Sequence, residues 1–285
     1  MLGLGQASRQ GFHGTLPFVF YCVGSHRTRV QTMNINILKP VAFIGPAAAE
    51  TIQKLYVLEQ RFLPLEVPEQ SDLSAVLAGL EPLGFLGAIL SGPVQTQALK
   101  LVTRQTQSAK RNGMIDAITP RGGIEGTSTL EDALLNSLED AGFQALGAHA
   151  VILGSSPVGF AATQLARAGF KTITVVGANR PAAEKLAKAL PAGVYQDALS
   201  QDDSRLSDVL ERADVLVHAS ADVKLKPSQM QPYHTLLEAS GETNLAVALE
   251  RAGGQVIPYS SVRTHHLAAQ LEFVTGWKFE ASSLL

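Results

Sequence analysis

From residue 35 onward, the hydrophobic positions of the chain follow two alternating spacings. Short apolar runs of strand length predict strands at 41–44, 63–67 and 85–90. The intervening stretches repeat apolar residues every three or four positions, which predicts helices at 47–62, 73–80 and 98–111. This βαβαβα order indicates a mostly parallel sheet with helices on its faces.

The second half of the chain repeats this α/β pattern. Strands are predicted at 151–153, 172–176 and 214–218, and helices at 131–143, 158–168, 182–190, 245–252 and 263–275. The helix at 131–143 stands between the two sets of strands, so we expect it to link two sheets. The sequence therefore predicts an α/β protein with two sheet domains in series.

The first 32 residues differ from the rest of the chain. They contain no acidic residue, and their glycines and short apolar patches follow neither a helical nor a strand period. Two interpretations stay open: a targeting or docking arm, or a poorly ordered extension ahead of a true start at Met33. In both cases we expect residues 1–32 to lie outside the fold.

Composition and charge limit the function classes. The chain has 285 residues, of which 46% are hydrophobic, and its net charge is −2. This balance predicts no attraction to nucleic acid or to an anionic membrane, and no apolar run reaches the roughly 18 residues of a membrane span. Cys22 is the single cysteine of the sequence, so an intramolecular disulfide or a thiolate metal cluster is impossible. We expect a cytoplasmic protein without a metal site.

A glycine turn follows the strand at 151–153 and opens the next helix. In dinucleotide-binding units the first glycine permits the tight turn, the second admits the pyrophosphate and the third lets helix and strand pack closely. Here the middle glycine is replaced by Ser156, whose side chain either crowds a pyrophosphate or donates to one of its oxygens. The turn is typical of a dinucleotide site, or of a Rossmann fold that binds no nucleotide. The candidate cofactor residues in it are Gly154, Ser155, Ser156, Val158 and Gly159.

The end of the next strand indicates which dinucleotide such a site would take. Sites for NAD usually place an acidic residue there to bind the ribose hydroxyls. This chain has Asn179 and Arg180 and no acid, and an arginine at that place suits the 2′-phosphate of NADP. A solvated surface arginine is the other interpretation. If a dinucleotide binds, NADP is favoured over NAD.

Together these features resemble the shikimate dehydrogenase family over roughly residues 39–277. The strongest stretch, 122–190, holds Gly-Ile-Glu-Gly ahead of the linker helix, then the glycine turn and Asn179-Arg180. Residues 269–277, which end in Thr-Gly-Trp, are similar to the family's final helix. The resemblance implies hydride transfer between NADP and shikimate in a cleft between two domains.

The resemblance also implies a domain organisation. Residues 33–130 would form a substrate domain, 131–255 a Rossmann dinucleotide-binding domain, and 256–285 a helix that returns to the N-terminal domain. The family occurs as monomers and dimers, so we expect a monomer or homodimer with a small-molecule ligand in the interdomain cleft.

The chain departs from the family where the proton is handled. The family's lysine closes an Asn-Val-Thr-x-Pro-x-Lys turn, and the matching position here is Gln95. The family's aspartate ends an Asn-Thr-Asp triplet, and the matching position is Leu130. A glutamine cannot shuttle a proton near neutral pH, and a leucine accepts no hydrogen bond. We therefore predict a degenerate active site and name no catalytic residue.

Positions that would face the substrate differ as well. The family's serine-containing carboxylate loop corresponds to residues 45–49, which carry no hydroxyl. Its substrate asparagine is matched by Asp116, which would repel an acid such as shikimate, and its last-helix glutamine falls at or near His266. The candidates for the substrate cleft are Ser91, Gln95, Asp116, Ser128 and His266.

Other ionisable residues could replace the missing pair. Glu131 and Asp132 would reach the cleft after a one-residue slip, but both also suit the first turn of a helix. Lys100 is expected to face solvent. His265 and His266 could act as a base, or they could begin a helix at the cleft rim.

Two hypotheses follow from these departures. One is an NADP-binding relative that has lost shikimate activity. The other is an NADP-dependent oxidoreductase that acts on a different, less anionic hydroxy or keto substrate.

Overall fold

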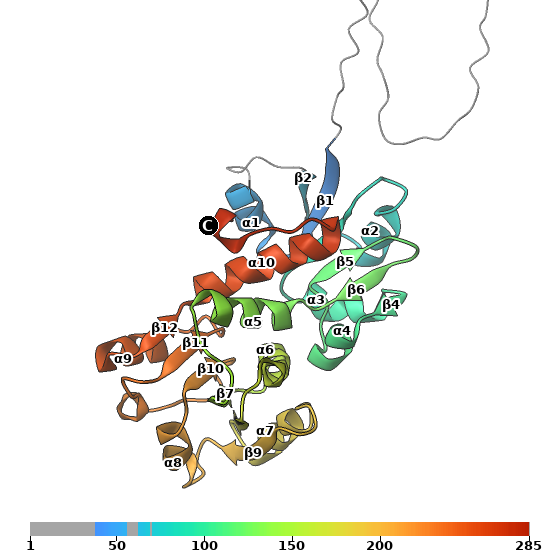
Figure 1. The fold of residues 1–285 in the computed structure, drawn as a ribbon. Coiled ribbons are helices and arrows are strands. Elements are labelled where there is room, and N and C mark those ends of the chain that lie inside the picture. The colour runs from blue at the N-terminus through green and yellow to red at the C-terminus, as the bar shows by residue number, and fades with distance from the viewer. Residues whose placement is uncertain (1–37, 56–61, 69, 285) are drawn as a thin grey trace, which may run out of the picture.

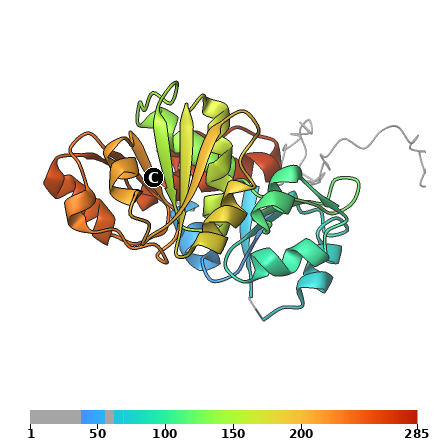
Figure 2. The same cartoon turned by 90° about the horizontal axis from the view of Figure 1, so that it is seen from below.

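The computed structural model describes residues 38–55, 62–68 and 70–284, so the predicted extension at 1–32, with Cys22, and Met33 lie outside the described residues. The described chain forms two α/β lobes, with two long helices running between them (Figure 1). Seen from below, the lobes lie side by side, the N-terminal elements in blue to green and the later sheet in yellow to orange (Figure 2). The predicted fold class, α/β with two mostly parallel sheets, is confirmed.

The N-terminal sheet has six strands in the order β2-β1-β3-β5-β6-β4. The strands are β1 (Lys39–Ile44), β2 (Phe62–Val67), β3 (Gly87–Leu90), β4 (Arg104–Gln105), β5 (Ala117–Thr119) and β6 (Glu125–Thr127). β1 pairs in parallel with β2 and β3, whereas β5 runs antiparallel to β3 and β6. The helices are α1 (Ala48–Leu55), α2 (Leu73–Gly79), α3 (Val94–Gln97) and α4 (Gln107–Asn112).

The second sheet has the doubly wound order of a Rossmann fold. Its six parallel strands are arranged as β12-β11-β10-β7-β8-β9, so the direction of winding reverses between β7 and β10. The strands are β7 (His149–Leu153), β8 (Thr172–Gly177), β9 (Tyr195–Ser200), β10 (Val215–His218), β11 (Thr235–Glu238) and β12 (Gln255–Ile257). The helices are α6 (Pro157–Ala162), α7 (Arg180–Ala187), α8 (Leu206–Glu211) and α9 (Asn244–Ala252).

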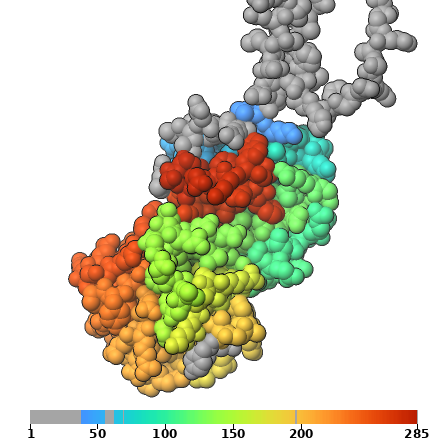
Figure 3. Space-filling model, in the orientation of Figure 1, coloured from blue at the N-terminus to red at the C-terminus, as the bar shows by residue number. Residues whose placement is uncertain are grey.

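The two long helices between the lobes belong to different cores. α5 (Leu130–Asp140) buries Leu134 and Leu138 in the core of the Rossmann sheet. α10 (Tyr259–Thr275) instead buries Leu271 and Val274 in the core of the N-terminal lobe, where the helix packs against β3 and β5. The C-terminal residues, red in Figure 3, accordingly lie against the first elements of the chain. No helix in the described ranges has the length and apolar character to cross a membrane.

The predicted helix at 98–111 is wrong. A 3₁₀ turn at Ala98–Lys100 leads into the extended strand β4, and α4 begins only at Gln107. The Thr106 hydroxyl accepts a hydrogen bond from the Ala109 N–H at 3.2 Å and so caps α4, and the Thr103 hydroxyl donates to the Ile124 carbonyl at 2.8 Å. Threonine hydroxyls compete with helical backbone bonds, so they interrupt the helix despite its apolar spacing.

Several predicted boundaries also shift. Phe62 begins β2 rather than ending a helix, and α1 is described as far as Leu55. The helix predicted at 158–168 is α-helical only at Pro157–Ala162, after which a 3₁₀ segment, Thr163–Ala168, continues it. α10 begins at Tyr259 rather than at residue 263. Pro258 is extended, with ψ at 157°, and is the N-cap residue directly before the first turn of the helix.

The buried His234 gives the fold a pH dependence. Burial lowers the pKa of His234, although the Leu210 carbonyl and the Asp214 carboxylate favour its charged form. The folded state prefers the neutral ring. The contribution of His234 to the free energy of unfolding is therefore complete above the ordinary histidine pKa and is lost as the pH falls below that value. Each unit of pKa shift corresponds to about 1.4 kcal/mol.

We therefore expect urea unfolding to give a lower free energy at pH 5.5 than at pH 7.5, and His234→Gln to flatten that difference. An equally steep profile in the variant would contradict the assignment to His234.

Candidate functional site

A cleft of about 840 Å³ opens between the two lobes. Its walls come from the ends of β1 and β3, the first residues of α5 and α6, and one face of α10. Pro157 and Val158 of the glycine turn line one part of it, and Ser91 and Gln95 line another. A ligand in the N-terminal part and a dinucleotide on the glycine turn would therefore share one space.

Asp116, directly before β5, is completely buried behind the cleft. Its carboxylate accepts hydrogen bonds from the Thr129 N–H at 2.9 and 3.0 Å, from the Thr129 hydroxyl at 3.1 Å and from the Ser128 hydroxyl at 3.3 Å. Its backbone carbonyl accepts from the Gln270 amide at 3.1 Å. Buried carboxylates require such partners, so Asp116 and Ser128 form a support that joins β5 to α5 and α10.

His266 connects this buried carboxylate to the cleft. Its Nε2 lies 3.0 Å from Oδ2 of Asp116, and its ring lines the cleft with 19% of the side chain exposed. A carboxylate only accepts, so Nε2 carries the hydrogen and Asp116 fixes the orientation of the ring. His265 does not line the cleft and lies 3.6 Å from Asp140.

Gln95 and Leu130, which the sequence predicts to stand in place of the family's catalytic pair, both line the cleft. The Gln95 amide donates to the Leu90 carbonyl at 2.9 Å, and Leu130 is nearly buried at the first residue of α5. The Ser91 hydroxyl is also engaged, because it accepts from the Ala47 N–H at 3.1 Å and donates to the Ile44 carbonyl at 3.3 Å. The Ser91 hydroxyl and the Gln95 amide nitrogen thus bind backbone.

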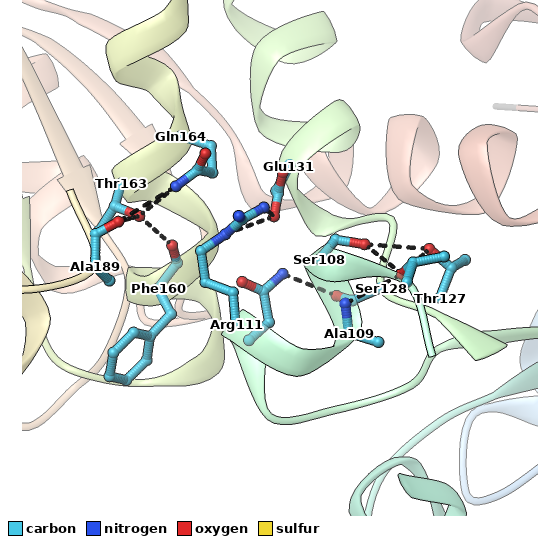
Figure 4. A network of polar contacts seen from close by, with 12 residues as sticks. Ser108, Ala109, Arg111, Thr127, Ser128, Glu131, Phe160, Thr163, Gln164 and Ala189 are labelled. Atoms are coloured by element: carbon cyan, nitrogen blue, oxygen red, sulfur yellow. Dashed lines mark hydrogen bonds and ion pairs between the residues drawn. The ribbon is translucent and has the colours of Figure 1, made fainter. Parts of the chain in front are cut away.

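The acidic residues after Leu130 do not line the cleft. Figure 4 shows Arg111 of α4 reaching across to Glu131, with which it forms an ion pair. Asp132 is an exposed residue whose carboxylate loses part of its hydration, and this raises the pKa of Asp132. Repulsion by the carboxylates of Glu131, Asp116 and Glu272 raises it further. Glu131 therefore joins α4 to α5.

The glycine turn leaves no room for side chains at its first and last positions. Gly154 has φ at +103°, and a Cβ there would lie 2.4 Å from the Ser220 Cβ. A Cβ at Gly159 would lie 2.3 Å from the Gly154 carbonyl oxygen. The Ser156 hydroxyl accepts from the Gly159 N–H at 3.3 Å and donates to the Ala219 carbonyl at 2.7 Å. Its single hydrogen is thus directed at protein backbone.

Asn179 and Arg180 follow β8, the strand beside β7. The Asn179 side chain caps α7 by accepting from the Ala182 N–H at 3.0 Å. Arg180 is 61% exposed and pairs with Glu184 at 2.9 Å. An exposed pair of this kind contributes little to stability, so the guanidinium can exchange Glu184 for an anionic ligand at small cost.

The pairing of Asp116 with His266 was missed by the sequence analysis, which considered each residue separately. The pairing could have been inferred from the resemblance, because it places both Asp116, an acid, and His266, a base, around one substrate. Within the described part of the chain, no group of three or more His, Cys, Asp or Glu side chains is placed to hold a metal ion.

Comparisons with known proteins agree with this architecture. No family model matches the chain. The shikimate dehydrogenase (NADP(+)) of Moorella thermoacetica is 29% identical over 220 residues, which cover 72% of this chain and 75% of that protein.

Two solved structures give the same fold at lower sequence identity. Shikimate 5-dehydrogenase from Listeria monocytogenes, solved with shikimate and NAD, has a TM-score of 0.74 at 17% identity over 87% of this chain and 95% of that one. The 5-ketofructose reductase of Gluconobacter sp. strain CHM43 has a TM-score of 0.71 at 17% identity over 87% of this chain and 96% of that one.

Proposed function

Because the chain is similar to curated shikimate dehydrogenases, we propose that it is a member of their family that binds NADP on its glycine turn and lacks the shikimate reaction of its relatives. One observation carries this proposal: the cleft is retained, but Gln95 and Leu130 stand in it where the family has its proton-handling lysine and aspartate. Neither side chain can exchange a proton near neutral pH.

The residues around the glycine turn fit a dinucleotide. Gly154 and Gly159 permit the tight turn and the close approach of α6 to β7 that a dinucleotide site needs, and Ser156 occupies the position that would face the pyrophosphate. Arg180, the first residue of α7, would hold the 2′-phosphate that distinguishes NADP from NAD. The chemistry that a bound nicotinamide supplies is donation or acceptance of a hydride at its ring.

The direct test separates cofactor binding from turnover. We expect calorimetric titration of the full chain to show NADPH binding, while NADP with shikimate, and NADPH with dehydroshikimate, give no change in nicotinamide absorbance. Steady oxidation of shikimate by the unaltered chain would reject the proposal.

Arg180→Ala should weaken NADPH binding about tenfold, or about 1.4 kcal/mol, and leave NADH binding unchanged. The matched control is Arg251→Ala, which removes an exposed arginine near the end of α9. Equal effects of Arg180→Ala on both nucleotides would show that Arg180 does not read the 2′-phosphate.

A second candidate function is favoured by the ionisable pair in the cleft. Gln95 and Leu130 give the cleft no titratable side chain at their positions, but the ring of His266, held by Asp116, supplies one. This supports an NADP-dependent oxidoreductase acting on a less anionic hydroxy or keto substrate. The structural neighbour named 5-ketofructose reductase is itself named for an uncharged ketone.

A further inference from the structure

We propose that His266, oriented by the buried Asp116, is the proton-transfer residue of the cleft, and that its substrate is an uncharged ketone or secondary alcohol with a hydrocarbon face. This inference rests on the oxidoreductase function proposed as the second candidate. It assigns that function a residue and a substrate class.

The geometry leaves one ring nitrogen available. Nε2 donates to Asp116 at 3.0 Å, whereas Nδ1 has no hydrogen-bond partner among the described residues. Asp116 cannot turn away from the ring, because Ser128 and Thr129 hold both of its carboxylate oxygens. The ring lines the cleft, is fixed by a buried anion at Nε2 and has no described partner at Nδ1.

This arrangement suits proton exchange with an oxygen atom. With NADP bound as the hydride acceptor, the hydroxyl proton of a substrate alcohol would pass to Nδ1 as the hydride leaves its carbinol carbon, and a carbonyl would remain. The resulting imidazolium is stabilised by the Asp116 carboxylate, 3.0 Å from Nε2. In the reverse direction the imidazolium returns this proton to the oxygen as the carbonyl carbon gains a hydride.

The surroundings of His266 determine the substrate class. Met114 and Leu130, both nearly buried, line the cleft together with Ile89 and Leu90. The cations that line its outer part, Lys54 and Arg263, both pair with Glu50. A hydrocarbon ring with one oxygen would thus meet apolar carbon and His266.

The first test measures the ring itself, without cofactor or substrate. In the full chain labelled with ¹⁵N-histidine, long-range ¹H–¹⁵N spectra at pH 8 should give His266 a bare Nδ1 and a protonated Nε2. His266→Gln identifies the signals, and Asp116→Asn should weaken this tautomer preference. A protonated Nδ1 with a bare Nε2 would overturn the proposal. A ring protonated on both nitrogens at pH 8 would also overturn it, since the pair would then be a structural ion pair.

The second test measures turnover of NADPH with cyclohexanone, 3-methylcyclohexanone and dehydroshikimate. The unaltered chain should reduce the two uncharged ketones and not the acid, and His266→Gln should lower kcat at least 100-fold with NADPH affinity unchanged. The matched control, His265→Gln, changes the neighbouring histidine that does not line the cleft and should retain the rate.

The two proposals fail in different ways. If NADPH binds but no ketone is reduced, or if His266→Gln retains the rate, the assignment to His266 is overturned and cofactor binding stands. If NADPH does not bind, the proposed function itself is rejected.

Discussion

Replacement of Gly154 by alanine is expected to lower the free energy of unfolding by about 2–5 kcal/mol and to abolish NADP binding. Two costs add at this position. The backbone has φ at +103°, which L-residues with a side chain rarely adopt, and the new Cβ would lie 2.4 Å from the Ser220 Cβ and 2.9 Å from the Ser220 nitrogen. Relief of this clash must displace either the glycine turn or the segment after β10.

Gly193→Ala separates the two costs. Gly193 also has a positive φ, +93°, but nothing lies within 4 Å of a Cβ there. We expect this control to lose only about 1–2 kcal/mol and to bind NADPH like the unaltered chain. Urea unfolding and calorimetric titration measure the two effects. Equal losses in the two variants would mean that contact with Ser220 does not constrain the turn.

Asp116→Ala is expected to lower the free energy of unfolding by about 2–4 kcal/mol. The substitution leaves the buried Thr129 N–H without the acceptor that it now has at 2.9 Å, and it removes the anion that holds His266. The Thr129 and Ser128 hydroxyls can rotate to other acceptors, so the N–H dominates the loss. The effect should appear in urea unfolding at pH 7.

The matched control for this substitution is Asp214→Ala. The Asp214 carboxylate also accepts a backbone N–H, that of His149 at 2.8 Å, but Asp214 is exposed and water can replace it. We expect the control to lose about 1 kcal/mol or less. Asp116→Asn, which keeps one oxygen acceptor, should fall between the two. A loss at Asp116 no larger than that at Asp214 would show that the buried network does not stabilise the fold.

The Rossmann sheet could be predicted where its strands are continuous apolar runs. β7, β8 and β10 are buried on both faces and are almost uninterrupted in hydrophobic residues, so their positions were predicted to within two residues. β11 was missed because its ends, Thr235 and Glu238, are polar. Glu238 is nevertheless buried, since His218 on the neighbouring strand lies 2.7 Å away. The hydrophobic pattern around Glu238 cannot reveal this burial, because its partner His218 lies 20 residues earlier in the chain.

The same limitation applies to the candidate site. The residues at 95 and 130 could be interpreted from short motifs, because each motif is contiguous in the chain. Asp116 and His266 are 150 residues apart, and only the packing of α10 against β5 brings them together. A charge that was expected to repel the substrate therefore lies behind the cleft, bound to its own histidine.

The last helix of the chain completes the lobe that is synthesised first. The buried core of that lobe combines residues from β1, α1, β2, β3 and β5 with four residues from the C-terminal part of the chain, Ala268, Leu271, Val274 and Leu284. Domains generally fold as units while the chain emerges from the ribosome. Every strand of the Rossmann lobe has emerged before α10 is complete, so that lobe can fold first. The N-terminal lobe cannot complete its apolar core until residues 268–284 have been synthesised.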